Sequence, residues 1–214
     1  MDLLESALSL LFPPRCLCCN QVVEPGEDCC RECRRTYPLF PPPGDWEGRP
    51  VVSVWTYLDQ YPVAIRRLKF QRDYPAGKRI ARLMAKQWKR QRPWQGKELI
   101  TFVPMPPERE RRRGGNQAEL LARWIGKELG CPVEGVLRRE GILTQHQLPA
   151  AARHRQENPM GLLPGAEAII AGRRVVLVDD LVTTGATAGA CIRLLEAAGA
   201  EQAAILVATR AAVG

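Results

Sequence analysis

Two adjacent carboxylates, Asp179 and Asp180, follow an apolar run in the stretch VVLVDDLVTTGATAG, residues 175–189. Behind them the turn Thr183-Thr184-Gly185-Ala186-Thr187 opens a run of small residues that predicts a helix. Backbone N–H groups of such a turn, together with the positive end of the helix dipole, form a cradle for an anion. Glycine lets the backbone approach closely, and threonine hydroxyls add donors. The turn therefore predicts a phosphate site.

The two carboxylates need a different partner, because their negative oxygens repel a phosphate. They suit hydroxyl donors or a hydrated Mg²⁺. A ligand with a phosphate at one end and a diol nearby, such as a ribose 5-phosphate, meets both requirements. The alternative is an acidic turn before a capped helix, since Asp and Thr are ordinary capping residues. The complete run from apolar strand to T-T-G-A-T favours the ligand site.

Six of the eight cysteines fall between residues 16 and 33, in CLCCNQVVEPGEDCCREC. Two C-x-x-C pairs joined by a turn-rich segment can place four thiolates at the corners of a tetrahedron, the geometry that Zn²⁺ accepts. Because all four ligands come from the protein, the predicted zinc site is structural. A disulfide framework is disfavoured in a reducing cytosol. Cys18 and Cys29 could substitute in the quartet. The predicted ligands are Cys16, Cys19, Cys30 and Cys33.

A phosphate-bearing ligand also needs cations, and the segment after the apolar stretch 99–103 supplies four arginines. Guanidinium groups pair with phosphates through two parallel hydrogen bonds. Gly114 and Gly115 follow the arginines and could act as a hinge for a mobile loop. The alternative is a solvated basic loop. The candidates are Arg109, Arg111, Arg112 and Arg113.

A second basic segment, residues 66–92, contains eleven Lys or Arg and a single acidic residue, Asp73. Trp88 and Trp94 lie in or near it. Basic surfaces with aromatic stacking platforms bind single-stranded nucleic acid, which makes single-stranded DNA one candidate partner. The alternative is a solvated helix face whose tryptophans belong to the core.

These residues need a scaffold, and the hydrophobic pattern predicts short strands that alternate with helices. Continuous apolar strands in such an alternation indicate a Rossmann-like α/β fold with a parallel sheet buried on both faces. Ligands of such sheets bind at the carboxyl ends of the strands, where Asp179 and Asp180 stand. The expected strands are 51–58, 99–103, 175–178 and 203–208, and the clearest helices are 117–129 and 186–198.

We expect three parts along the chain. Residues 1–40 contain a short amphipathic helix and the cysteine module, 41–50 are a Pro- and Gly-rich linker, and 51–214 form the α/β domain. The N-terminal stretch has no basic region of the kind that opens a secretory signal, and no apolar run approaches the ~20 residues that span a bilayer. A soluble, cytoplasmic protein is therefore expected.

The overall charge indicates the class of binding partner, and the two histidines give no sign of a metal site. A net charge of +8 and a pI near 9.3 favour anionic partners: nucleic acid, phosphorylated small molecules or acidic lipid. His146 and His154 are the only histidines, and neither has a partner at metal-ligand spacing. We expect both to be polar surface or loop residues.

The segment VVLVDDLVTTGAT resembles the phosphoribosyl-pyrophosphate motif of type I phosphoribosyltransferases, and nearly the whole chain resembles the ComF family of competence and DNA-uptake proteins. The wider likeness rests on the four-cysteine module and on RRLKF (66–70), TFVPMP, RRRGGNQAELLA (111–122) and a QHQL…R…N region. Two departures are visible. Gly115 stands where the family usually has an aromatic residue, and the spacing between QHQL and Asn158 is slightly long.

The resemblance implies a type I phosphoribosyltransferase-like domain with a zinc-ribbon-like module before it. Asp179 and Asp180 would contact the ribose hydroxyls of phosphoribosyl pyrophosphate, the turn 183–187 would bind its 5-phosphate, and Mg²⁺ would accompany it. Lys69 becomes a further cation candidate through its place in RRLKF.

Three functions remain open at this point. The first is a protein of DNA uptake in natural transformation, with single-stranded DNA or competence-machinery proteins as partners. The second is an active phosphoribosyltransferase, a pentosyl transfer enzyme that acts on an unidentified nucleobase-like acceptor. The third is a zinc-stapled binding module with a vestigial or regulatory pocket. The sequence assigns no catalytic residue and shows no acceptor-binding hood.

Overall fold

The computed structural model of the chain describes residues 13–37, 39–57, 62–91, 94, 98–139 and 160–211. The expected N-terminal helix, both histidines and the QHQL region lie outside the described residues. Within the described ranges, no helix is both long enough and apolar enough to cross a membrane.

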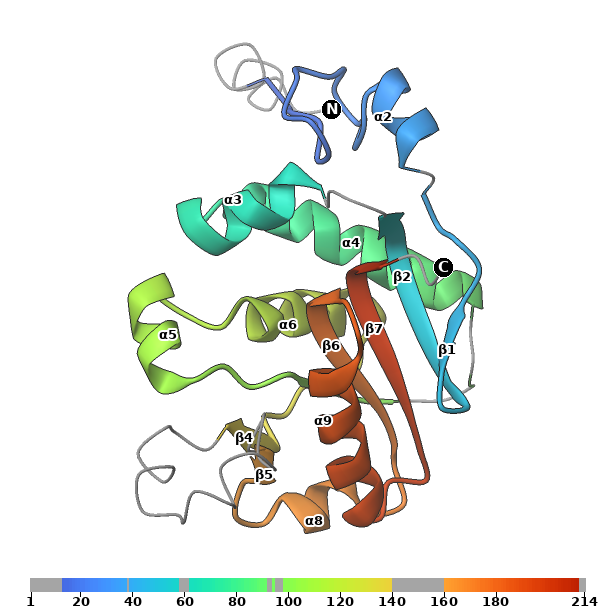
Figure 1. Cartoon of the computed structure of the whole chain (residues 1–214), viewed down its shortest axis with the longest axis vertical. Helices are drawn as coiled ribbons and strands as arrows, with labels where there is room; N and C mark the ends of the chain where they lie inside the picture. The colour runs from blue at the N-terminus through green and yellow to red at the C-terminus, as the bar shows by residue number, and fades with distance from the viewer. Residues whose placement is uncertain are drawn as a thin grey trace.

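A five-stranded sheet forms the centre of the fold, in the order β1-β2-β7-β6-β3 (Figure 1). The pairs β2–β7, β7–β6 and β6–β3 are parallel, whereas β1 pairs antiparallel with β2 at the edge. A separate antiparallel pair joins β4 to β5. The predicted α/β fold with a parallel sheet is confirmed. The strands are β1 (Gly44–Trp46), β2 (Arg49–Tyr57), β3 (Leu99–Phe102), β4 (Leu137–Arg139), β5 (Met160–Leu162), β6 (Arg174–Val182) and β7 (Gln202–Ala211).

Helices cover both faces of this sheet, as its continuous apolar strands require. Val176 and Val178 of β6 join the apolar cluster that includes α4 and α6. Val175 and Leu177 point the other way and join the cluster that includes α8 and α9. All four side chains are fully buried. The helices are α2 (Arg31–Thr36), α3 (Val63–Gln71), α4 (Tyr74–Gln91), α5 (Pro107–Arg113), α6 (Gln117–Leu129), α8 (Ala166–Ile170) and α9 (Ala186–Ala197).

The cysteine module, defined here as residues 13–37, is docked on α3 and α4 (Figure 1). The first N–H groups of α3, from Val63 and Ala64, donate to the carbonyls of Cys18 and Leu17 at 3.0 and 2.8 Å. These bonds satisfy two donors that a helix start otherwise leaves unpaired. Arg79 of α4 donates to three oxygens of the module at 2.6 to 3.0 Å. The module therefore holds α3 by its N-terminus.

Residues 41–50, expected as a linker, contain β1 and the start of β2. The chain reverses at Glu47 and Gly48, whose φ values of +50° and +81° lie in the left-handed region. Trp46 then faces Arg49 across the strand pair. The Pro- and Gly-rich composition predicted a linker. It did not reveal β1, because this short strand is formed by pairing with β2 and not by a local sequence pattern.

Trp46 brings this hairpin against the start of α9. A Cβ at Gly189 would overlap the Trp46 ring, and one at Gly185 would lie 2.8 Å from its Cδ1 atom. The Arg49 and Arg193 guanidinium carbons lie 5.8 and 5.5 Å from the ring centroid, within range of cation–π attraction. The ring therefore supports the turn before α9 and requires glycine at both positions.

We expect Gly189→Ala to lower the free energy of unfolding by about 1–3 kcal/mol, because the added methyl overpacks the site against Trp46. In a Trp46→Ala background the same substitution should become neutral or stabilising, since alanine favours helix over glycine by about 1 kcal/mol. Denaturant unfolding of the two single variants and the double variant tests this. Equal costs of Gly189→Ala in both backgrounds would contradict the contact.

Trp88 lies in the core and not on a binding surface. It is 4% exposed and packs edge-on against Trp94, with ring centroids 5.6 Å apart. The interpretation of the tryptophans as core residues therefore holds for Trp88, and a stacking platform on this stretch needs another aromatic residue.

Candidate functional site

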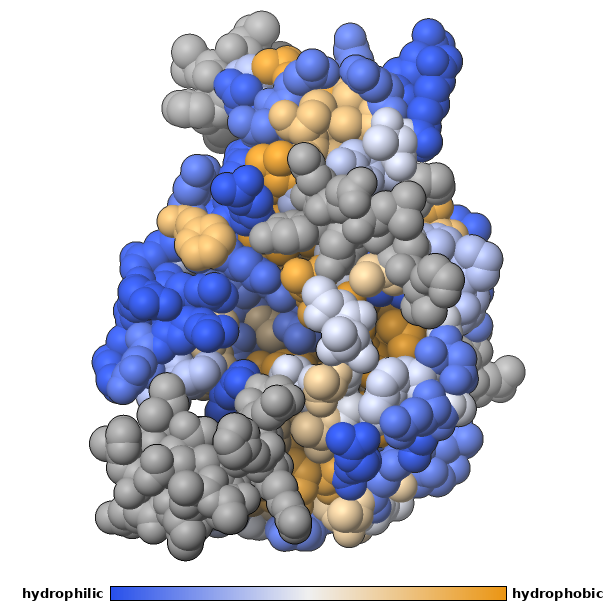
Figure 2. Space-filling model, in the orientation of Figure 1, coloured by the Kyte–Doolittle hydropathy of each residue, from blue (hydrophilic) through white to orange (hydrophobic). Residues whose placement is uncertain are grey.

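A cavity of about 230 Å³ lies at the carboxyl end of β6, between the turn into α9 and the segment after β3. Figure 2 shows this face of the molecule hollowed near its middle. The structure brings every residue predicted for phosphate and ribose binding to this one cavity. They are Asp179, Asp180, Thr183, Thr184, Gly185, Ala186 and Thr187.

The turn into α9 has the form of an anion cradle. Gly185 is the residue before the helix, and its φ of +78° is left-handed, a conformation that glycine adopts without strain. The Ala186 N–H donates weakly to Thr184 Oγ1 at 3.4 Å. Because the first N–H groups of a helix lack partners within the helix, those of α9 are donors directed at the cavity.

The acidic pair lies within the last residues of β6. The Asp180 N–H donates to Asp179 Oδ1 at 2.8 Å, and Lys69 Nζ lies 2.7 Å from Asp180 Oδ2. Lys69, near the end of α3, thus neutralises one carboxylate of the pair. Burial, and then the charge of Asp180, raise the pKa of the Asp179 carboxyl to about 8.

Two of the four candidate arginines reach the cavity. Arg109 and Arg113 line it, whereas Arg111 and Arg112 are exposed and are not among its lining residues in the described part of the chain. The expected loop is a helix, α5, with Pro107 at its start. Proline at the first position, acidic residues in the first turn and arginines in the last all favour a helix there. Helical spacing explains why adjacent arginines point in different directions.

Arg139 and Asn116 also line the cavity, and sequence reasoning assigned neither to the site. Arg139, at the end of β4, lines it, and burial and the charge of Arg109 lower the Arg139 pKa. Nothing local marks Arg139, because the β4–β5 pairing joins segments far apart in the chain. Asn116 donates to the Val103 carbonyl at 2.9 Å and caps α6 by accepting from the Ala118 N–H at 3.0 Å. Asparagine before a helical pattern is a capping signal that could have found it.

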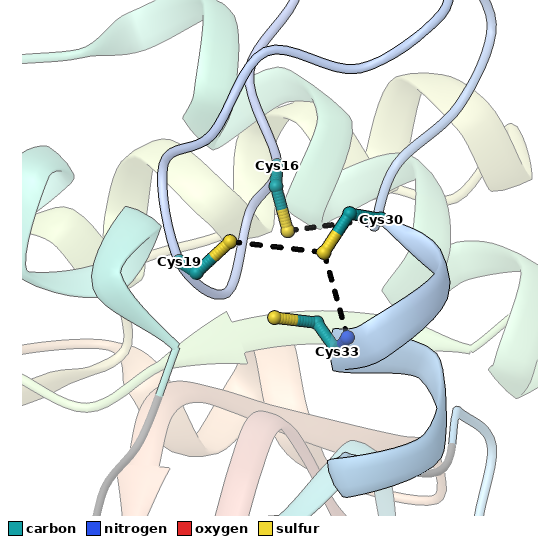
Figure 3. Close-up of side chains that lie close together, drawn as sticks. All are labelled: Cys16, Cys19, Cys30 and Cys33. Atoms are coloured by element: carbon teal, nitrogen blue, oxygen red, sulfur yellow. Dashed lines mark hydrogen bonds between the residues drawn. The ribbon is translucent and has the colours of Figure 1, made fainter.

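The two C-x-x-C pairs converge on one point (Figure 3). The Sγ atoms of Cys16, Cys19, Cys30 and Cys33 all lie within 4.8 Å of one another, and those of Cys19 and Cys30 are 3.8 Å apart. With Zn–S bonds of about 2.3 Å, a tetrahedral site needs sulfur atoms about 3.8 Å apart. The four-cysteine cluster therefore fits a structural zinc ion.

The pKa values of Cys16 and Cys33 are shifted in opposite directions. Burial alone raises the pKa of Cys16, but backbone N–H groups of Cys19, Cys30 and Cys18 outweigh it and lower the pKa to about 6. Burial raises the pKa of Cys33, and the neighbouring thiols raise it further. Four thiolates at this spacing repel one another, and a divalent metal ion removes that repulsion.

Cys18 and Cys29 form a separate buried pair with their Sγ atoms 3.5 Å apart. With Cys16 they make a second group of three thiols within 4.8 Å. A tetrahedral ion held by this group would lack a fourth cysteine, so the four-cysteine cluster is the better match to zinc.

Comparison with known families agrees with this architecture. A profile described as "Phosphoribosyl transferase domain" matches residues 117–213, and one described as "Double zinc ribbon domain" matches residues 7–54. The α/β fold, the β6–α9 turn and the cysteine cluster define a protein of phosphoribosyltransferase type with an N-terminal zinc-ribbon segment.

Curated relatives narrow the class. "DNA utilization protein YhgH" of Salmonella typhimurium is 31% identical over 86% of this chain and 85% of its own length. "Competence protein F" of Haemophilus influenzae is 29% identical over 88% of this chain and 81% of its own. "Competence protein ComFC" of Streptococcus pneumoniae is 29% identical over 92% and 89%. The chain belongs to the ComF/YhgH family, which confirms the resemblance.

Proposed function

We propose that the chain binds phosphoribosyl pyrophosphate, or a related ribose 5-phosphate, in the cavity at the end of β6. The observation that carries the proposal is the single cavity in which an anion cradle adjoins a carboxylate pair. In this arrangement the turn 183–187 binds the 5-phosphate. Asp179 and Asp180 accept hydrogen bonds from the ribose hydroxyls.

The cations of the cavity face the pyrophosphate end of this ligand. Arg109, Arg113 and Arg139 lie on walls other than the turn into α9. Lys69 lies 2.7 Å from Asp180 Oδ2 and lines the same cavity, within reach of the same ligand. Mg²⁺ would be held chiefly by pyrophosphate oxygens and water, with the carboxylates as further oxygen ligands.

We further propose that Cys16, Cys19, Cys30 and Cys33 hold Zn²⁺ and that its task is structural. The module has few apolar residues of its own, and metal binding can supply the free energy of folding that it lacks. Thiolate ligands need a reducing compartment, so the proposal places the chain in the cytoplasm.

The biological role we infer is in DNA uptake during natural transformation, with single-stranded DNA or proteins of the competence machinery as partners. The names of the relatives and the net charge of +8 support it.

A second candidate is an active phosphoribosyltransferase with a nucleobase-like acceptor. It is favoured by cations and carboxylates in one cavity, which pyrophosphate departure requires. Pyrophosphate release on adding nucleobases distinguishes the two.

The double variant Asp179→Asn/Asp180→Asn tests ligand binding. With Mg²⁺, phosphoribosyl pyrophosphate should stabilise the wild-type protein by about 2.7 kcal/mol at 100 times its Kd. The variant should gain no stability, because the ribose loses both carboxyl groups of the pair. Thermal unfolding with and without ligand measures this. Glu128→Gln/Glu134→Gln, two exposed carboxylates away from the cavity, should behave as wild type. Equal stabilisation of all three proteins would reject the site.

Binding should also depend on pH through Asp179. Its pKa is raised to about 8, so at pH 7 the carboxyl is mostly protonated and is a weaker acceptor for a hydroxyl. We expect affinity for phosphoribosyl pyrophosphate to rise several-fold, at most roughly tenfold, from pH 7 to pH 9 as Asp179 ionises. Titrations across this range measure it. Asp179→Asn should bind more weakly and without this rise; an identical rise in that variant would assign the titration to another group.

A further inference from the structure

We propose that Phe70 and Arg113 form a nucleobase-stacking platform for single-stranded DNA at the rim of the phosphate cavity. The inference rests on the proposed function for its class of partner, and it locates the partner's site. Phe70 lies near the end of α3 and is 66% exposed, although it is a large aromatic residue.

The Phe70 ring does not pack in the core beneath α3. Ala64, Ile65 and Leu68 are the residues that this helix buries in the core, at 0%, 1% and 2% exposure. Phe70 lies on the opposite, solvent-facing side, where leucine or a polar residue would leave the core unchanged. An exposed aromatic ring with no role in the core is available to a ligand that stacks on it.

The ring is connected to the cavity on two sides. Its chain neighbour Lys69 lines the cavity and contacts Asp180. The guanidinium carbon of Arg113, another lining residue, lies 5.2 Å from the centroid of the Phe70 ring. Aromatic rings and guanidinium planes are the two surfaces on which unpaired bases stack. A base on Phe70 would thus lie beside the pocket that we assign to a phosphate.

The surroundings of the ring are basic. The ends of α3 and α5 meet there, because a Cβ at Gly114 would lie 2.6 Å from the Arg72 guanidinium carbon. Glu108 and Glu110 belong to the first turn of α5, and Arg111, Arg112 and Arg113 form its last turn. Figure 2 shows the flank over α3 and α5 as strongly hydrophilic. The exposed basic side chains of α3, of Arg72 directly after it and of α5 are Arg66, Arg72, Arg109, Arg111 and Arg112.

This combination selects single strands over duplex DNA. Phosphates of either form would bind the arginines of α5, but only a single strand offers an unpaired base face to Phe70. An anionic peptide would use the charges and leave the ring without a partner. The ring also supplies the aromatic surface that Trp88, buried in the core, does not.

The test is fluorescence anisotropy of a short labelled oligothymidylate with the full, zinc-loaded chain. Phe70→Ala should weaken binding roughly fivefold or more, the usual loss for one stacked base. Phe70→Trp should bind as tightly as wild type or tighter, and Phe70→Leu should resemble Phe70→Ala. Val22→Ala removes another exposed apolar side chain, at 57% exposure on the cysteine module, and should leave binding unchanged.

Salt dependence separates the ring from the charges. Phe70→Ala should leave the slope of log affinity against log salt unchanged, whereas Arg113→Ala should reduce it by up to about 1. Binding to a duplex of the same length should not respond to Phe70→Ala. Wild-type affinity in both Phe70→Ala and Phe70→Leu, or no binding of the oligonucleotide by the wild type, would overturn the platform.

A titration of the same proteins with phosphoribosyl pyrophosphate tests the stacking platform and the proposed ligand separately. Phe70→Ala should retain the stabilisation by phosphoribosyl pyrophosphate. If the wild type binds oligothymidylate through Phe70 but is not stabilised by phosphoribosyl pyrophosphate, the platform stands and the proposed ligand is wrong. If the wild type is stabilised by phosphoribosyl pyrophosphate and Phe70→Ala binds DNA normally, the proposed ligand stands and the platform is wrong.

Discussion

Removing zinc from the intact chain should weaken binding of phosphoribosyl pyrophosphate by roughly tenfold, although the cysteine cluster and the cavity share no residue. The helix α3 connects the cysteine cluster to the cavity. Its first N–H groups donate to the carbonyls of Leu17 and Cys18, which lie between the proposed zinc ligands Cys16 and Cys19. Its far end carries Lys69 to within 2.7 Å of Asp180. Loss of the metal releases the start of α3 and with it the position of Lys69.

Calorimetry on zinc-loaded and chelator-treated protein measures this effect, with metal content determined on each sample. Circular dichroism should show that the parallel sheet remains, since its core lies under α6, α8 and α9 as well as α4. Lys69→Met provides the control. Zinc-loaded Lys69→Met should already bind weakly, and removing zinc from it should cost less than in wild type, because the two changes act on one contact. Unchanged affinity in folded, zinc-free protein would contradict the route.

Gly185→Val should reduce affinity for phosphoribosyl pyrophosphate by roughly a hundredfold or more. A β-branched residue is strained at a φ of +78°, and its Cβ would lie 2.8 Å from the Trp46 ring. The turn must shift, and the N–H donors of the cradle then miss the phosphate. Loss of two charge-assisted hydrogen bonds, each worth about 1.5–3 kcal/mol, accounts for a change of this size.

Gly165→Val is a matched control for this variant. Gly165 precedes α8 with the same φ of +78°, but a Cβ there would meet open space and the residue does not line the cavity. Both variants should lose about 1–3 kcal/mol of stability through backbone strain. Only Gly185→Val should lose affinity in a calorimetric titration below its melting temperature. Equal affinity losses in the two variants would show that strain, and not the cradle, is responsible.

The parts of the fold that local signals determine could be predicted from sequence. Asn116 and Gly130 mark the two ends of α6, and the expected helix 117–129 matches the structure. The run that contains Asp179, Asp180 and the turn behind them lies within one strand–turn–helix unit, so its geometry depends on few distant contacts. The residues expected to bind one ligand consequently line one cavity.

The remaining features depend on contacts between distant segments. Arg139 reaches the cavity only because β4 pairs with β5 across the chain. Trp46 packs against α9, and the exposure of Phe70 follows from which face of α3 the core takes. The helix α5, in contrast, has local signals in the sequence. Pro107 at its start and the order of acidic and basic residues along it indicate a helix, although the four arginines suggested a basic loop. Element type was therefore more predictable than the direction in which each side chain points.

The most direct test of the central claim is titration calorimetry of phosphoribosyl pyrophosphate with Mg²⁺ into folded, zinc-loaded wild-type protein. The account predicts saturable binding of one ligand per chain, lost in Asp179→Asn/Asp180→Asn and in Gly185→Val and kept in Gly165→Val. Absence of binding by the wild type, or binding that survives both cavity variants, would contradict the assignment of the β6–α9 cavity to a phosphoribosyl ligand.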